Sequence, residues 1–281
     1  MENTKRIKAV ISDLDGTLLN QHHTLSELSK ETIKVLKDHG VQFLIATGRH
    51  HCDAKKIRER LDVEAFIIAA NGATVLNPAG EIIHQAVMNP EVVARLLELE
   101  IGEGVFKNIY QEDHWMVEVI DRVFEDYYQE GDFVYTLCKL KEQLSKPINK
   151  MFFTSRDHDL LIPIEKQVLE NYGDYVDVTF SMPQCLEIMP KGTNKGQALT
   201  ETLKHLGITL DESVAFGDGM NDFEMLSVVG TGYLMANAND QLKMRLPNNP
   251  QIGHHAEDAV AKKIIEIFSI ESIKKDPLSA S

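Results

Sequence analysis

The sequence contains few cysteines, an excess of acidic over basic side chains and no long apolar run, and each feature excludes a class of protein. The three cysteines include no Cys-x-x-Cys pair, which argues against a disulfide framework and a thiolate metal site. The 43 acidic side chains against 29 basic ones give a formal net charge of −14, so nucleic acid and anionic membranes are poor partners. Nowhere is there a membrane-spanning run of about 18 apolar residues, and the apolar segment before Ser12 is too short for a signal peptide. We therefore expect a soluble, cytoplasmic protein.

Apolar runs of strand length alternate with helix-like runs at both ends of the chain, whose 281 residues suit two domains or one large one. Near the N-terminus we expect strands at Ile7–Ser12, Val41–Ala46 and Ala65–Ala70, and helices at Thr24–His39 (capped by Thr24 and Glu27) and Asp53–Leu61. Towards the C-terminus we expect strands at Ser213–Phe216 and Gly232–Ala236 and helices at Lys195–Leu206 and Glu257–Phe268. This alternation predicts right-handed βαβ units and a parallel sheet covered by helices on both faces.

The middle of the chain has a different pattern, in which paired strands accompany a few helices. We expect strands at Val105–Tyr110, Trp115–Ile120, Lys150–Thr154 and Val176–Ser181, and helices at Glu91–Glu100, between Ile120 and Lys150, and at Asp159–Tyr172. Such a segment of about a hundred residues can form an α+β domain with its own core. We therefore predict an inserted domain at residues 85–186 and a parallel-sheet core built from residues 1–84 and 187–281.

Each of four expected core strands ends in a group of small and polar residues. The strands lead, in order, into Asp13-Leu14-Asp15-Gly16-Thr17, Thr47-Gly48-Arg49, Asn71-Gly72 and Gly217-Asp218-Gly219-Met220-Asn221-Asp222. Because ligands bind outside the carboxyl ends of parallel strands, we expect these groups to meet in one crevice. Small residues there let backbone N–H groups approach an anion closely.

Four aspartates in that crevice, Asp13, Asp15, Asp218 and Asp222, would repel one another. Two like charges within ~4 Å cost roughly 4 kcal/mol at an effective dielectric of 20, so the cluster needs a cation. Oxygen ligands without accompanying Cys or His point to Mg²⁺. Of the closely spaced pair Asp13 and Asp15, one aspartate, bound to the metal, could attack phosphorus. The other, partly protonated, could donate a proton to the leaving oxygen and later activate water. With Lys195 steadying the nucleophile and the phosphoryl oxygens, the residues indicate Mg²⁺-dependent phosphoryl transfer to water.

Four motifs in this order resemble those of the haloacid dehalogenase-like (HAD) hydrolase superfamily, and within it the Cof-type phosphatases. They are DLDGT at 13–17, TGR at 47–49, NKGQAL at 194–199 and GDGMND at 217–222, and the likeness covers nearly the whole chain. The resemblance implies an α/β fold with a Rossmann-like parallel-sheet core and an inserted α+β cap domain of the Cof type (C2B). ATGRHH at 46–51 and QCLEIM at 184–189 look closest to the members that dephosphorylate pyridoxal phosphate.

The resemblance also implies a role for each motif residue. Asp13 would be the nucleophile and a Mg²⁺ ligand, and Asp218 a further ligand. Asp15 would be the general acid/base and would bind the metal through its backbone carbonyl. The phosphate would be held by the backbone N–H of Leu14 and by Thr47, Gly48, Lys195 and Asn221. Supporting roles would fall to Asp222, beside the metal, and to Thr17 and Asn71.

These roles predict a Mg²⁺-dependent phosphatase that acts on small phosphomonoesters, with pyridoxal phosphate as the first candidate and a sugar phosphate as the second. A cap of this size restricts access, so phosphoproteins are poor candidates. Two alternatives are a phosphomutase, which keeps the same intermediate from water, and a non-catalytic phospho-acceptor or binding module resembling a receiver domain. Of three His-His pairs in the sequence, only His50-His51 follows a motif loop into the crevice and is kept as a candidate site.

Overall fold

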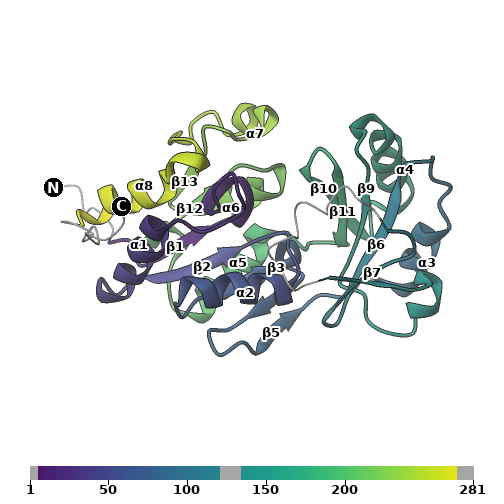
Figure 1. The fold of residues 1–281 in the computed structure, drawn as a ribbon, viewed down its shortest axis with the longest axis horizontal. Helices are drawn as coiled ribbons and strands as arrows, with labels where there is room; N and C mark the ends of the chain where they lie inside the picture. The colour runs from purple at the N-terminus through teal and green to yellow at the C-terminus, as the bar shows by residue number, and fades with distance from the viewer. Residues whose placement is uncertain (1–5, 121–133, 271–281) are drawn as a thin grey trace, which may run out of the picture.

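The computed structural model describes residues 6–120 and 134–270, and these form two β-sheets that lie side by side (Figure 1). The larger sheet, here called the core sheet, has the strand order β13-β12-β1-β2-β3-β4-β5 within the described residues. The smaller one, the cap sheet, has the order β10-β11-β9-β6-β7-β8. The predicted α/β architecture, a parallel-sheet core with an inserted α+β cap, is confirmed.

The core sheet is parallel at its centre, where β1 pairs with both β12 and β2. Its strands are β1 (Ala9–Ser12), β2 (Gln42–Ala46), β3 (Phe66–Ala69), β4 (Thr74–Leu76), β5 (Ile82–Gln85), β12 (Ser213–Gly217) and β13 (Thr231–Leu234). Every residue of β1 and β3 is buried, which explains why these strands, apart from Ser12 at the end of β1, are apolar instead of alternating. β4 and β5 add an antiparallel hairpin at one edge, which the sequence pattern did not predict.

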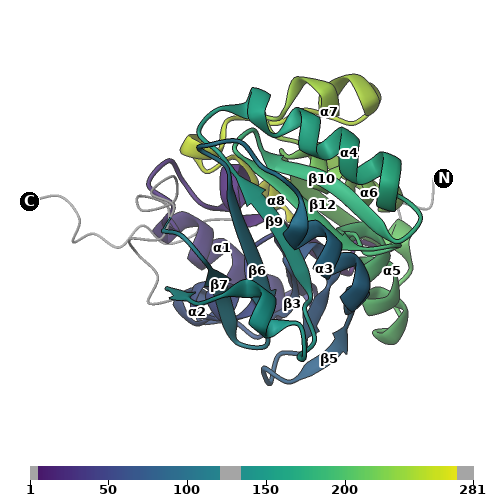
Figure 2. The same ribbon diagram turned by 90° about the vertical axis from the view of Figure 1, so that its right-hand side faces the viewer.

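Helices cover both faces of the core sheet, with α1, α2 and α8 on one face and α5 and α6 on the other (Figure 2). The helices of the core are α1 (Glu27–Asp38), α2 (His51–Leu61), α5 (Lys195–His205), α6 (Phe223–Val228), α7 (Asp240–Arg245) and α8 (Ala259–Phe268). The predicted capping of α1 by Thr24 and Glu27 is wrong. Ser26 caps the helix by accepting the Ser29 N–H at 3.0 Å, because the Thr24 hydroxyl donates to the Asn20 side chain instead.

The cap sheet is antiparallel except where β7 pairs with β8. The cap comprises α3 (Pro90–Glu98), β6 (Phe106–Gln111), β7 (His114–Val117), β8 (Tyr135–Leu137), β9 (Lys150–Thr154), α4 (Ile162–Tyr172), β10 (Val176–Met182) and β11 (Cys185–Pro190). The helix expected between Ile120 and Lys150 falls partly on residues 121–133, outside the described residues. In the described remainder of that segment the chain forms β8 and a 3-10 turn instead of an α-helix.

Alternation along the cap strands separates an outer from an inner face. In β9, Met151 and Phe153 pack against α3 and α4, while Phe152 faces the core together with Tyr110 and Cys185. The cap helices therefore cover only the outer face, and the inner face of the cap sheet is turned towards the core.

The chain crosses between the two sheets twice, at residues 86–89 between β5 and α3 and at residues 191–194 between β11 and α5. The expected domain boundary at 186/187 falls inside β11, which pairs with β9 and β10 of the cap sheet. The division into domains stays a prediction, and we place its second boundary after Pro190.

Candidate active site

The carboxyl ends of the central core strands meet at the edge that faces the cap. Asp13 follows β1, and its N–H donates to the carbonyl of Phe216 in β12 at 3.0 Å. Thr47 follows β2, and its N–H donates to the carbonyl of Ile68 in β3 at 2.8 Å. These bonds continue the parallel pairing past the strand ends, so the motif segments that follow the strands lie next to one another, as the sequence predicted.

Three carboxylates form the acidic centre of this site. One oxygen each from Asp13, Asp218 and Asp222 lies within 4.8 Å of the other two. Burial raises the pKa of Asp13 well above its usual range, despite the opposing charge of Lys195. Burial, followed by the charge of Asp222, raises the pKa of Asp218 to about 7. A hard divalent cation bound by oxygen would supply the positive charge that these groups lack, so the residues fit Mg²⁺.

Lys195 joins two of the acidic groups. Its Nζ donates to Asp13 Oδ1 at 2.8 Å and to Asp222 Oδ1 at 2.6 Å, and its side chain is completely buried. Burial by itself lowers the pKa of Lys195, but the two carboxylates outweigh burial and raise the pKa above its usual value. The lysine is therefore held in its charged form against the proposed nucleophile.

Asp222 and Thr17 fix the position of Asp218. The second oxygen of Asp222 accepts the N–H groups of Asp218 and Gly219, both at 2.9 Å, and the Thr17 hydroxyl donates to Asp218 Oδ1 at 2.8 Å. A Cβ on Gly217 would lie 2.7 Å from the Asp222 side chain, so the loop requires glycine there. Of the three expected supporting residues, Asp222 is thus part of the acidic centre and Thr17 contacts it directly.

Asp15 faces a guanidinium instead of the three-carboxylate cluster. Arg49 donates to both Asp15 oxygens, from Nε and from Nη2, at 2.6 Å each, and its Nη1 donates to Asp53 Oδ2 at 2.8 Å. A bidentate pair of this kind is a strong, charge-assisted interaction that stabilises the carboxylate. The Asp15 side chain is therefore held in place by Arg49.

The residues expected to hold the phosphate surround the acidic centre. Thr47 is fully buried, and its hydroxyl oxygen accepts the Arg49 N–H at 3.1 Å. Asn221 donates to Asn71 Oδ1 at 3.1 Å, which brings the polar group after β3 next to the GDGMND motif. Leu14 opens the turn between the two aspartates and buries its side chain in the core. The structure brings all the expected residues to one site, while their roles remain predictions.

The cap provides the other wall of the site. The same cleft as Asp13, Asp15 and Asp218 is lined by six cap residues, namely Tyr110, Phe152, Ser181, Met182, Cys185 and Glu187. Four of these side chains are aromatic or contain sulfur, and only one is charged. The cap wall therefore combines aromatic and sulfur-containing side chains with the polar Ser181 and Glu187.

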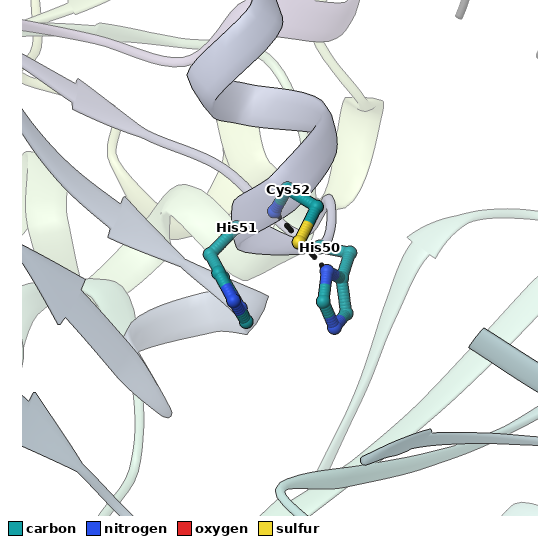
Figure 3. A group of neighbouring side chains, drawn as sticks. All are labelled: His50, His51 and Cys52. Carbon is teal, nitrogen blue, oxygen red and sulfur yellow. Dashed lines mark hydrogen bonds between the residues drawn. The ribbon is translucent and has the colours of Figure 1, made fainter. Parts of the chain in front are cut away.

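His50, His51 and Cys52 lie at the start of α2, and their ligand atoms come within 4.8 Å of one another (Figure 3). His50 Nδ1 accepts the Cys52 N–H at 3.1 Å and so caps the helix, while its Nε2 lies 3.0 Å from the carbonyl of Glu112 in the cap. His51 Nε2 lies 2.9 Å from Asp113 Oδ1. Burial lowers the pKa of His50 to about 3. Because hydrogen bonds engage both nitrogens of His50, we interpret the group as a contact between core and cap.

Sequence reasoning assigned no role to three charged residues at this site. Arg49 belonged to a quoted motif, and its partner Asp53 stands four residues later on α2. Lys150 and Glu187 come from two cap strands and are almost completely buried. A charged side chain within an apolar strand, as in CLEIM, is the signal that could have singled out Glu187.

A capped α/β core with clustered aspartates and a buried lysine at its strand ends defines a phosphate-ester hydrolase. The chain belongs to the haloacid dehalogenase-like hydrolase family, whose model matches residues 10–264. An HMP-PP phosphatase from Cronobacter sakazakii is 35% identical over 249 residues, which are 89% of this chain and 91% of that protein. The chain is therefore a HAD-type phosphomonoester hydrolase.

Solved structures agree with this assignment. A haloacid dehalogenase-like hydrolase from Bacteroides thetaiotaomicron is similar with a TM-score of 0.79 and 26% identity, over 94% of this chain and 100% of that one. A HAD subclass IIB sugar phosphatase is similar with a TM-score of 0.78 and 25% identity, again over 94% and 100%. The resemblance to Cof-type phosphatases is confirmed. Within the described residues, no helix has the length and apolar composition needed to cross a bilayer.

Proposed function

We propose that the protein is a Mg²⁺-dependent phosphatase that hydrolyses a small phosphomonoester through an aspartyl-phosphate on Asp13. The observation that carries this proposal is the contact of buried Lys195 with Asp13 and Asp222, next to Asp218. Asp13, Asp218 and the backbone carbonyl of Asp15 would hold Mg²⁺, with Asp222 beside it. The bound ion would neutralise the carboxylates and the phosphoryl oxygens.

In the first step the Asp13 carboxylate attacks phosphorus, the bond to the leaving oxygen breaks, and Asp15 gives that oxygen a proton. In the second step Asp15 takes a proton from water, whose oxygen attacks phosphorus and releases Asp13 and inorganic phosphate. Lys195 orients Asp13 throughout. Arg49 donates to both oxygens of Asp15 and so favours its ionised form, and weakening these contacts would make it easier for Asp15 to carry a proton.

The cap wall supports an aromatic leaving group. Tyr110, Phe152, Met182 and Cys185 offer ring faces and sulfur atoms, which suit a flat heterocycle better than the hydroxyls of a sugar. Pyridoxal phosphate remains the first candidate and a sugar phosphate the second. The names of two similar proteins, an HMP-PP phosphatase and a sugar phosphatase, add HMP-PP to the candidates and keep sugar phosphates among them. The cytoplasmic location stays a prediction.

Release of inorganic phosphate from a panel of phosphomonoesters, with Mg²⁺ and with chelator, tests this function. We expect the Asp13→Asn variant to lose activity by at least about 10⁴-fold, because an amide cannot form the intermediate. Substantial Mg²⁺-dependent turnover by D13N would show that the assigned nucleophile is wrong. Stimulation by a bisphosphate would reveal a phosphomutase, and stable labelling without release a phospho-acceptor. Family membership favours hydrolysis over both.

A further inference from the structure

The cap contributes a buried ion pair that the reaction scheme above does not use. Lys150 Nζ donates to Glu187 Oε1, and the two side chains are only 1% and 4% exposed. Lys150 also lies 5.1 Å from the ring centroids of both Tyr110 and Phe152. An ion pair buried this deeply loses hydration that only well-made contacts can replace, so its other partners indicate what it does.

The sheet register explains why the two charges meet on the inner face of the cap. Glu187 of β11 stands opposite Phe152 of β9, and Lys150 is two residues before Phe152 on the same side of the strand. The neighbours of Glu187 in β11, Leu186 and Ile188, point into the core of the cap instead. Strand alternation therefore turns both charged groups towards the catalytic domain.

Both members of the pair reach across to motif residues of the core. Lys150 Nζ donates to the carbonyl of Gly48 at 2.9 Å. The amide of Asn71 donates to Glu187 Oε2, and Asn71 Oδ1 accepts the Asn221 amide at 3.1 Å. A continuous chain of hydrogen bonds thus runs from the cap to two of the four motif segments.

The fit at the junction is close. A Cβ on Gly48 would lie 3.2 Å from Asn71 Oδ1 and 3.3 Å from Glu187 Oε1. Each Glu187 oxygen already accepts a hydrogen bond, from Lys150 and from Asn71, so the carboxylate is committed to these partners although it lines the cleft. Its contacts to the core exist only when the cap lies in the observed position.

We propose that Lys150 and Glu187 are positioning residues through which closure of the cap sets the geometry of the phosphate site. The pair stays together on the cap, and closure brings it against Gly48 and Asn71, which fixes the loop after β2 and, through Asn71, the amide of Asn221. The proposal rests on the proposed phosphatase function. It predicts that the phosphate site is complete only under a closed cap.

The Glu187→Gln variant tests this proposal, with Glu170→Gln on the outer helix α4 as its control. Glu170 is exposed and forms an ion pair with Lys166 at 3.9 Å. With p-nitrophenyl phosphate and Mg²⁺, we expect E187Q to lower kcat by about 10- to 100-fold, because small displacements at a reacting centre have effects of this size. E170Q should retain the kcat of the wild type. Equal kcat values for the two variants would overturn the proposal.

The exchanged pair Lys150→Glu/Glu187→Lys separates positioning from simple stabilisation of the cap. The exchange keeps both charges together but places a carboxylate against the Gly48 carbonyl and removes the acceptor for Asn71. We expect thermal unfolding to recover towards the wild type while kcat stays low. If kcat recovers together with stability, the pair only stabilises the cap and the proposal is wrong.

Hydrogen exchange gives a readout that does not depend on turnover. Inorganic phosphate with Mg²⁺ should slow exchange at the N–H groups of Thr47, Arg49 and Asn71 in the wild type and in E170Q, but much less in E187Q. Equal protection in both variants would contradict the proposal. A wild type without Mg²⁺-dependent hydrolysis would refute the phosphatase function, whereas an active wild type with an unaffected E187Q would refute only the positioning role.

Discussion

Lys195 in the core and Lys150 in the cap are both almost completely buried and both contact a carboxylate, yet their surroundings differ in charge. Lys195 meets Asp13 and Asp222, with Asp218 close by, so the group keeps an excess of negative charge. Lys150 meets one carboxylate and one backbone carbonyl, so that group is neutral. Under the proposed function the unbalanced cluster would bind a cation, whereas the balanced pair of Lys150 and Glu187 would hold its neighbours in place. This difference in net charge is why we propose a chemical role for the group around Lys195 and a positioning role for the group around Lys150.

Replacing Lys195 should have the largest effect. We expect Lys195→Met to lower kcat by about 10³-fold or more, because the variant loses the cation that orients Asp13 and faces the phosphoryl group. Steady-state kinetics with saturating Mg²⁺ measures this loss. Lys204→Met is the control, because Lys204 lies on the same helix with its side chain 77% exposed. If K195M kept a tenth of the wild-type kcat, Lys195 would not differ from Lys150 in its importance for the chemical step.

Changes to the ion pair of Lys150 and Glu187, here called the cap pair, should alter both the free energy of unfolding and kcat, and the two effects can be separated. We expect Lys150→Met to lower the free energy of unfolding by about 3 kcal/mol, because Glu187 remains as an unpaired buried charge. The double variant Lys150→Met/Glu187→Leu should recover most of that loss, since no charge is left buried, but its kcat should stay low. Urea unfolding with chelator and kinetics with Mg²⁺ separate the two effects. A double variant as unstable as K150M would mean that the pair itself stabilises the cap.

The unbalanced charge at the core site should make stability depend on pH and on Mg²⁺. The folded pKa of Asp218, about 7, lies above its ordinary value of 3.8, so between these pH values the folded protein holds a proton that the unfolded chain releases. Without metal, the contribution of Asp218 to stability therefore decreases as pH rises from about 4 to 7. Mg²⁺ prefers the ionised carboxylates and should add ~2.7 kcal/mol at one hundred times its Kd.

Thermal unfolding at pH 5 and pH 8, with chelator and with Mg²⁺, measures this dependence. Stabilisation by Mg²⁺ should be larger at pH 8 than at pH 5, and Asp218→Asn should reduce the difference. Equal stabilisation at both pH values would argue that the carboxylates are not the metal ligands.

The smallest effect is expected at the second contact between core and cap. His51 meets Asp113, whose side chain is 76% exposed, and solvent screening leaves such a pair with at most about 1 kcal/mol. His51→Gln should therefore leave kcat unchanged and lower the free energy of unfolding by less than about 1 kcal/mol. If H51Q lowered kcat as much as E187Q does, loss of any contact between core and cap would lower kcat, and Lys150 and Glu187 would have no special role.

The catalytic half of this comparison could be predicted from the sequence, because its residues follow neighbouring parallel strands and must meet at one edge. Asp13, Thr47, Asn71 and Asp218 are related by that rule alone. The cap half could not be predicted in this way. Lys150 and Glu187 meet through the antiparallel register of β9 and β11, and β11 itself was absent from the expected strands.

The bidentate contact of Arg49 with Asp15 was equally out of reach, since the sequence places these residues at the ends of two strands without fixing where their side chains point. The same limit explains the wrong cap of α1. Thr24 and Ser26 are equally suitable as capping residues by type, and only the competing bond from Thr24 to Asn20 decides between them.

The two crossings between the sheets have a mechanical consequence. One groove is lined by residues of both connections, namely Ala86, Val87 and residues 190–194. The two segments that connect the core and the cap therefore run close to each other. Two adjacent connections permit rotation about the line through them and resist twisting in other directions. Rotation of the cap about this line would then return Lys150 and Glu187 to the same position against Gly48 and Asn71 each time the cap closes. Contacts that depend on ångström distances could therefore form again after repeated opening.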